Sequence, residues 1–142
     1  MPMIQEKDRQ TIRQLFAARL VNPVRLVLFT QATECPYCEQ TRQLAEEVAA
    51  LADPISLEVY DFAADLEQVQ AFGIDKTPAI AILGTQDYGV RYYGIPAGHE
   101  FATFIEDIVA VSAGAADLQP ETQAALAQVQ QPVHIQVFVT PT

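Results

Sequence analysis

Two cysteines lie two residues apart in the segment Cys35-Pro36-Tyr37-Cys38, and they are the only cysteines of the 142-residue chain. A structural disulfide across so short a loop would constrain the unfolded chain little. A structural zinc ion needs about four protein ligands, and neither His99 nor His134 stands at a finger-like spacing from the pair. We therefore interpret the pair as a site of reversible thiol–disulfide chemistry, and we expect no metal.

The segments on either side of the pair indicate how it is held. Val24–Thr30 is an apolar run after the helix-breaking Asn22-Pro23, which predicts a buried strand. The apolar spacing over residues 36–52 predicts a helix with Pro36 in its first turn. A C-x-x-C pair near such β-α-β patterning is the signature of a thioredoxin-like redox site.

Hydrophobic periodicity predicts the helices and strands of the rest of the chain. It predicts helices over residues 4–20, 66–72, 101–109 and 118–131, and strands over residues 55–62, 78–83 and 90–93. Strands that alternate with helices favour parallel pairing, and the last two strands form a hairpin. The predicted fold class is therefore α/β, with a central mixed sheet flanked by helices and an extra N-terminal helix.

Length and charge exclude several functions. The chain has the length of one domain, and its 8 basic and 18 acidic residues give a net charge of −10. Phosphate backbones and anionic membrane surfaces would be repelled, so we expect neither nucleic acid nor a membrane as a partner. The first residues lack the apolar core of a signal peptide. With so few cysteines, we expect a reducing cytoplasm, although an exported chain without its leader would look similar.

Three stretches resemble the glutaredoxin-like protein disulfide oxidoreductases. They are the strand–Cys35-Pro36-Tyr37-Cys38–helix unit, the dipeptide Thr77-Pro78 at the start of a strand, and Tyr-Tyr-Gly-Ile-Pro-Ala-Gly-His-Glu-Phe at residues 92–101. That family joins two thioredoxin-fold modules in one chain, each with its own C-x-x-C. The resemblance covers essentially the whole chain. It implies protein disulfide substrates, a dithiol or disulfide redox partner, and no cofactor.

The resemblance also divides the chain. Residues 133–142 repeat the character of residues 24–33, and in the family such a strand directly precedes the second C-x-x-C. We expect a thioredoxin-like module at residues 1–117, a connecting helix at 118–131 and the start of a truncated second module at 132–142. Alternatively, residues 133–139 are the last edge strand of one domain. As an orphaned strand, this segment would favour self-association.

Each residue of the pair has an expected role. Cys35 lies at a helix N-terminus, which favours the thiolate, so we expect it to be the nucleophile. Cys38, one turn further into the helix and more buried, would resolve the mixed disulfide. Pro36 and Tyr37 would shape the active-site turn. Glu34 would disfavour a neighbouring thiolate, although we favour the interpretation that it is an ordinary solvated loop residue.

Thr77 and Pro78 are the expected substrate-binding residues. The resemblance implies a cis peptide bond between them that faces the cysteines, with the Thr77 backbone open to an incoming peptide strand. Thioredoxins keep a buried acid on the strand before the cysteines, but residues 29–31 are Phe, Thr and Gln. The glutathione-binding Gly-Gly turn of glutaredoxins is replaced by residues 93–96, Tyr-Gly-Ile-Pro. Protein disulfides are therefore the favoured substrate class.

Three alternatives stay open. The chain could be a binding module without chemistry, which a test of reversible cysteine oxidation would reveal. It could be the N-terminal redox or docking module of an alkyl hydroperoxide reductase-like flavoprotein, which doubles the same fold. It could also bridge an iron–sulfur cluster across a dimer, although Pro36 and the missing glutathione features disfavour this. The direction of electron flow depends on energies too small for a sequence to resolve.

Overall fold

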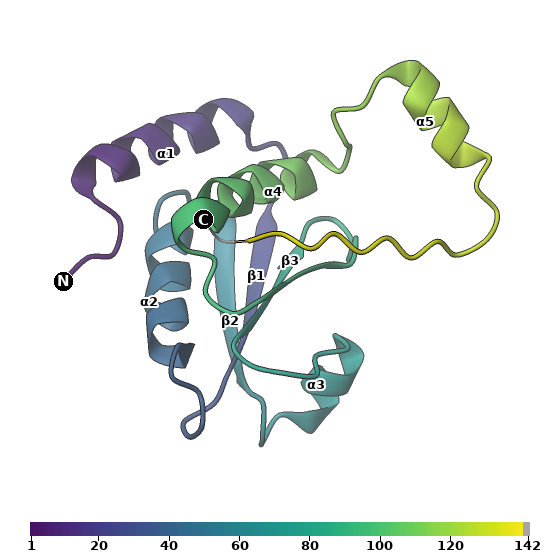
Figure 1. Cartoon of the computed structure of the whole chain (residues 1–142). Helices are drawn as coiled ribbons and strands as arrows, with labels where there is room; N and C mark the ends of the chain where they lie inside the picture. Colours follow the sequence, from purple (N-terminus) through teal and green to yellow (C-terminus); the bar gives the residue numbers. More distant parts are fainter. Residues whose placement is uncertain (141–142) are drawn as a thin grey trace.

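The computed structural model describes residues 1–140 and contains a four-stranded sheet of order β2-β1-β3-β4 (Figure 1). The strands are β1 (Val24–Thr30), β2 (Ile55–Asp61), β3 (Ala79–Leu83) and β4 (Val90–Tyr93). β1 runs parallel to β2 and antiparallel to β3, which in turn pairs antiparallel with β4. The predicted mixed sheet with a hairpin at one edge is confirmed.

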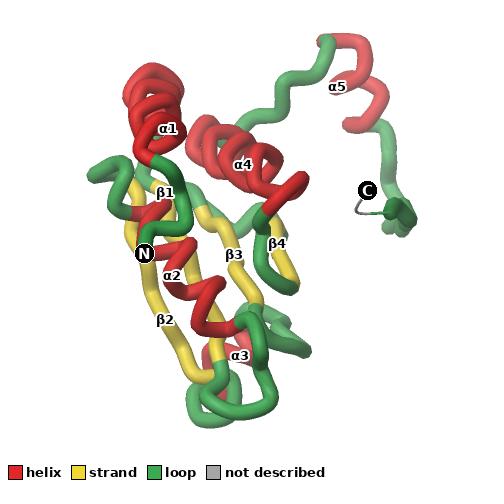
Figure 2. Tube along the Cα trace, turned by 60° about the vertical axis from the view of Figure 1, so that its left-hand side comes forward, coloured by secondary structure: helices red, strands yellow, loops and turns green. Residues whose placement is uncertain are grey.

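Helices cover both faces of this sheet. They are α1 (Glu6–Arg19), α2 (Cys38–Ala49), α3 (Leu66–Ala71), α4 (Phe101–Ala113) and α5 (Pro120–Ala127), with a short 3₁₀ helix, η1 (Gly98–Glu100), before α4. Figure 2 shows α2 in front of the strands and α3 behind their lower end. None of these helices is long and apolar enough to cross a membrane, for the residues that the structure describes.

The central strand β1 divides the core into two clusters. Its residues Val24, Leu26 and Leu28 face one cluster, which also contains buried side chains of α1, α2 and α4. Val27 and Phe29 face the other cluster, beside the α3 segment. Because successive side chains of a strand point to opposite faces, a strand covered on both sides is a nearly continuous apolar run. This burial on both faces explains why the apolar sequence of β1 predicts a strand.

The start of α2 differs from the prediction. Pro36 was expected in the first helical turn, but α2 begins at Cys38, and Pro36 lies in the preceding turn. Tyr37 has φ −109° and ψ 4°, which is outside the helical region. Regular helical bonding therefore begins only where the Thr41 N–H donates to the Tyr37 carbonyl, at 2.9 Å.

The strand predicted at residues 133–139 is wrong. The structure shows no secondary structure there, and the side chains are exposed, including Ile135 and Phe138. A strand needs a hydrogen-bonded neighbour, and none of the strands in the described chain pairs with this segment. Helix α5 before it buries no side chain and projects away from the sheet (Figure 1). Residues 141 and 142, at the end of the expected second module, lie outside the described residues.

Candidate active site

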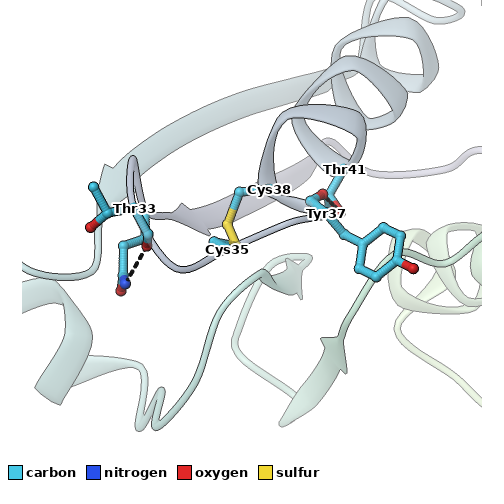
Figure 3. Close-up of a disulfide and its surroundings, with 6 residues drawn as sticks. Thr33, Cys35, Tyr37, Cys38 and Thr41 are labelled. Carbon is cyan, nitrogen blue, oxygen red and sulfur yellow. Dashed lines mark hydrogen bonds between the residues drawn. A yellow bond between two sulfur atoms is a disulfide. The ribbon is translucent and has the colours of Figure 1, made fainter.

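Cys35 and Cys38 form a disulfide with a Cα–Cα distance of 5.4 Å (Figure 3). It joins the loop after β1 to the first residue of α2. Cys38 is buried, with 2% of its surface exposed, whereas Cys35 is only partly buried. The pair can therefore exist as a disulfide without moving its backbone, and its outer member is the one that solvent reaches.

Thr41, at the start of α2, stabilises the turn between the cysteines by a hydrogen bond. The Thr41 hydroxyl donates to the Tyr37 carbonyl at 2.7 Å, and its side chain is fully buried. The Tyr37 ring points away from the disulfide in Figure 3 and is 57% exposed. On the other side of the cysteines, the Gln31 amide donates to the Thr33 carbonyl at 2.7 Å. Hydrogen bonds therefore hold the loop on both sides of the disulfide.

Thr77 and Pro78 come to the same end of the sheet as the cysteines. β3 is antiparallel to β1 with Ala79 opposite Phe29, so the start of β3 lies where β1 ends. The loop that carries Cys35 leaves β1 at this same end. The Thr77–Pro78 peptide bond is cis, as the resemblance implies. The Gly94 N–H donates to the Pro78 carbonyl at 2.9 Å, which ties the end of β4 to this corner.

The last fully buried residue of β1 before the cysteine loop is aromatic rather than acidic. Phe29 is fully buried, and its ring centroid lies 5.7 Å from that of Tyr60 and 5.8 Å from that of Phe72. Asp61, the acidic residue that ends β2, accepts hydrogen bonds from the backbone of Ala63 and Ala64. Its carboxylate therefore closes the turn after β2. The last two residues of β1, Phe29 and Thr30, carry no carboxylate.

Tyrosines of β4 line the neighbouring edge. Tyr92 packs edge-on against Phe104, and its hydroxyl donates to Asp107 at 2.5 Å. Burial raises the pKa of Tyr92, and the Asp107 carboxylate raises it further. Tyr93 is 39% exposed, with the Lys76 ammonium 4.8 Å from its ring centroid. Tyr92 is therefore a packing residue, while Tyr93 remains at the surface beside the Thr77–Pro78 corner.

The two histidines of the chain lie outside the cysteine loop. His99 lies exposed in η1, and His134 is exposed in the segment after α5. Residues 1–140 contain no group of three or more His, Cys, Asp or Glu side chains placed to hold a metal ion. Sequence reasoning missed Thr41, although a threonine four residues after a turn carbonyl is a recognisable local signal.

The sheet order, the C-x-x-C pair at a helix start and the cis proline at the same sheet end define a thioredoxin-fold protein with a disulfide-forming pair. The chain belongs to the thioredoxin family: the family model described as thioredoxin domain matches residues 26–106. A probable thioredoxin of Methanothermobacter thermautotrophicus is 34% identical over 85 residues, which are 59% of this chain and 94% of that protein.

Two solved structures extend the similarity beyond the family match. A protein disulfide oxidoreductase from Aeropyrum pernix K1 superposes with a TM-score of 0.78 at 28% identity, over 87% of this chain. The N-terminal domain of alkylhydroperoxide reductase AhpF from Enterococcus faecalis gives a TM-score of 0.73 at 25% identity, over 85% of this chain. The chain covers 54% and 58% of these two structures, respectively.

Proposed function

We propose that this chain is a thiol–disulfide oxidoreductase that exchanges electrons with protein disulfides through Cys35 and Cys38. The observation that carries the proposal is the unequal exposure of two bonded cysteines at the start of α2. The similarity to the Aeropyrum pernix protein disulfide oxidoreductase supports it. A stabilising role does not explain the bond, because it closes a loop over a sequence separation of only 3.

The unequal exposures support the following order of the two steps. In the reduced protein, the Cys35 thiolate attacks one sulfur of the substrate disulfide, and the other substrate sulfur leaves as a thiolate. Cys38 then attacks the Cys35 sulfur, which breaks the mixed disulfide and releases the second substrate thiol. The protein loses two electrons and ends in the disulfide form. A dithiol partner reverses the change in the protein and completes the cycle.

The surface around Cys35 favours a protein over a tripeptide substrate. The Thr77 backbone lies at the sheet end beside the cysteine loop, where an extended chain can add by backbone hydrogen bonds. Tyr93 and Gly94 occupy the positions of the glutathione-binding Gly-Gly turn of glutaredoxins. We further propose a cytoplasmic location, because a reducing compartment regenerates the dithiol.

Catalysed reduction of a protein disulfide tests this function. With dithiothreitol as the reductant, the full chain should accelerate insulin reduction, measured as precipitation of the free B chain. The variant with both cysteines changed to serine is the matched control and should show only the uncatalysed rate. A wild-type rate equal to that of the control would contradict the proposal. A faster reaction with glutathionylated peptides than with insulin would overturn the substrate class.

A second candidate is the N-terminal redox or docking module of a hydroperoxide reductase flavoprotein. The match to the Enterococcus faecalis AhpF domain favours it. Both candidates agree with a division into a module at residues 1–117, a connecting helix at 118–131 and the start of a second module at 132–142. Sequencing the intact transcript separates them. Flavin-binding motifs downstream would support the reductase, and an end after a second thioredoxin module would support the oxidoreductase.

We also propose that residues 133–139 mediate self-association. The segment exposes five large apolar side chains, Val133, Ile135, Val137, Phe138 and Val139. The segment contains no Lys, Arg, Asp or Glu, so it carries none of the charges that give the chain its net charge of −10. Two copies can pair as strands through their backbones. Sedimentation should show a dimer that is lost when residues 133–142 are deleted; an unchanged oligomeric state would contradict this role.

A further inference from the structure

The residue before Cys35 has an unusual backbone conformation. Glu34 has a φ of 56°, in the left-handed region, and no other non-glycine residue among residues 1–140 has a positive φ. The remaining positive-φ positions are glycines, at 73, 89, 94, 98 and 114. A residue with a Cβ adopts this conformation at a free-energy cost that glycine avoids. The turn geometry alone would therefore favour glycine at position 34.

The contacts of the Glu34 side chain do not offset this cost. The side chain is exposed, and within the described chain no hydrogen bond or ion pair includes it. The loop is held instead by the Gln31 bond to Thr33 and by the Cys38 N–H, which donates to the Cys35 carbonyl at 3.3 Å. What Glu34 adds to the site is a carboxylate in the residue next to the nucleophile.

Two cations of neighbouring segments are paired with other carboxylates. Lys76, beside Thr77, lies 3.1 Å from Asp75, and Arg42 on α2 lies 2.9 Å from Glu46. Glu39, in the first turn of α2, adds a further negative charge close to Cys38. The favourable influence on a Cys35 thiolate therefore comes from the N-terminus of α2, and Glu34 acts against it.

We propose that Glu34 is a positioning residue that sets the redox equilibrium of the pair by disfavouring the Cys35 thiolate. A negative neighbour destabilises the thiolate and thereby the reduced form, while the neutral disulfide is unaffected. The equilibrium with two glutathione thiols, which gives the protein dithiol and one glutathione disulfide, shifts toward the protein disulfide. Glu34 thus makes the chain a stronger reductant. This inference rests on the proposed function.

The variant Glu34→Gln tests the charge while keeping the size of the side chain. Compared with wild type, we expect the pH midpoint of Cys35 alkylation to fall by about half a unit. Above that midpoint, the equilibrium with glutathione should shift about 3-fold toward the dithiol, the size expected for neighbouring unit charges in water. Both effects should shrink in about 1 M salt. Glu121→Gln, which removes an exposed acid of α5, is the matched control.

The outcomes separate this inference from the function on which it rests. If Glu34→Gln behaves like Glu121→Gln in both measurements, the inference is wrong while the redox function stands. If wild type forms no reversible disulfide, the proposed function itself fails. Glu34→Gly tests the backbone: it should match Glu34→Gln in alkylation and unfold at a higher denaturant concentration, because glycine adopts the left-handed conformation freely. Unfolding at a lower concentration would contradict the strained turn.

Discussion

Cys35 and Cys38 share one disulfide but lie in different surroundings, since Cys38 is 2% exposed and Cys35 is partly open to solvent. A bulky substrate reaches only the outer sulfur. We therefore predict that Cys35→Ser reduces turnover of protein disulfides to the uncatalysed rate. Cys38→Ser should retain the first attack and accumulate a mixed disulfide with the substrate, because the resolving thiol is missing. Non-reducing gels and intact mass measure the trapped species.

The reverse pattern would overturn these roles. If Cys35→Ser traps substrate through Cys38, the buried cysteine is the nucleophile and the exposures do not determine reactivity. Reduction of the trapped adduct with dithiothreitol should return the Cys38→Ser chain at its original mass and the substrate in its fully reduced form, which controls for other modifications.

Thr41 should stabilise the active-site turn by a modest amount. Its hydroxyl bond to the Tyr37 carbonyl is buried, but the Thr41 N–H also donates to this carbonyl. Thr41→Val keeps the shape and leaves the carbonyl with one partner, so we expect a loss of about 1 kcal/mol of unfolding free energy. Thr41→Ser keeps the hydroxyl and is the control. Equal urea midpoints for Thr41→Val and wild type would show that the bond contributes nothing.

Ser112 should have a larger effect, far from the cysteines. Its fully buried hydroxyl accepts hydrogen bonds from the N–H groups of Val21 (2.8 Å) and Asn22 (3.0 Å) and donates to the Asn22 carbonyl (2.7 Å). These bonds attach the end of α4 to the loop before β1. Ser112→Ala leaves the Val21 N–H without this acceptor, and we predict a loss of about 1–3 kcal/mol. Urea unfolding measures this loss.

Ser56 of β2 provides the comparison for Ser112. It is exposed, so Ser56→Ala should change the unfolding free energy by no more than about 0.5 kcal/mol. Similar losses for the two variants would mean that the Ser112 network does not fix the start of β1.

Glu47, on α2, binds the segment before α1 by accepting hydrogen bonds from the backbone N–H groups of Met3 and Ile4. Burial of its side chain opposes the charge, but hydrogen bonds from the backbone of Met3 and Ile4 and from Gln43, together with the Arg9 charge, hold the pKa of Glu47 below its usual value of 4.5. A carboxyl whose pKa is lowered in the folded state stabilises the fold above its unfolded pKa. That contribution is lost as the pH falls below 4.5 through the folded value.

The variant Glu47→Gln tests this link. We expect it to lower the unfolding free energy by about 1–2 kcal/mol at pH 7, since bonds to a charged group are lost. Its difference from wild type should narrow as the pH falls below 4.5. Glu46→Gln is the control, because Glu46 is 52% exposed in its pair with Arg42 and should contribute about 0.5 kcal/mol or less. A difference from wild type that is independent of pH would refute the explanation.

The sequence predicted the parts of the fold that depend on local patterns. β1 is continuous and apolar because both of its faces are buried, and Asn22-Pro23 marks the chain break before it. Cys35 and Cys38 were found from their spacing, and the cis bond at Thr77–Pro78 came from the family resemblance. The helix at residues 118–131 was also located, although the structure shortens it to Pro120–Ala127.

The remaining features depend on contacts or dihedral angles that no local pattern encodes. Residues 133–139 have the alternation of a strand, but a strand forms only beside a partner. Glu47 and Ser112 act on backbone groups 43 to 91 positions away in the chain. The left-handed turn at Glu34 is hidden because a positive φ is expected of glycine, asparagine or aspartate rather than of glutamate.

A redox titration of the full chain tests the central claim most directly. The protein is equilibrated in dithiothreitol and glutathione buffers of graded potential, and the state of Cys35 and Cys38 is determined by thiol alkylation and intact mass. We expect a reversible two-electron transition between the dithiol and the disulfide, with the same midpoint from the oxidised and from the reduced side. A chain that forms no disulfide at any potential would contradict it and would favour a binding role for the module.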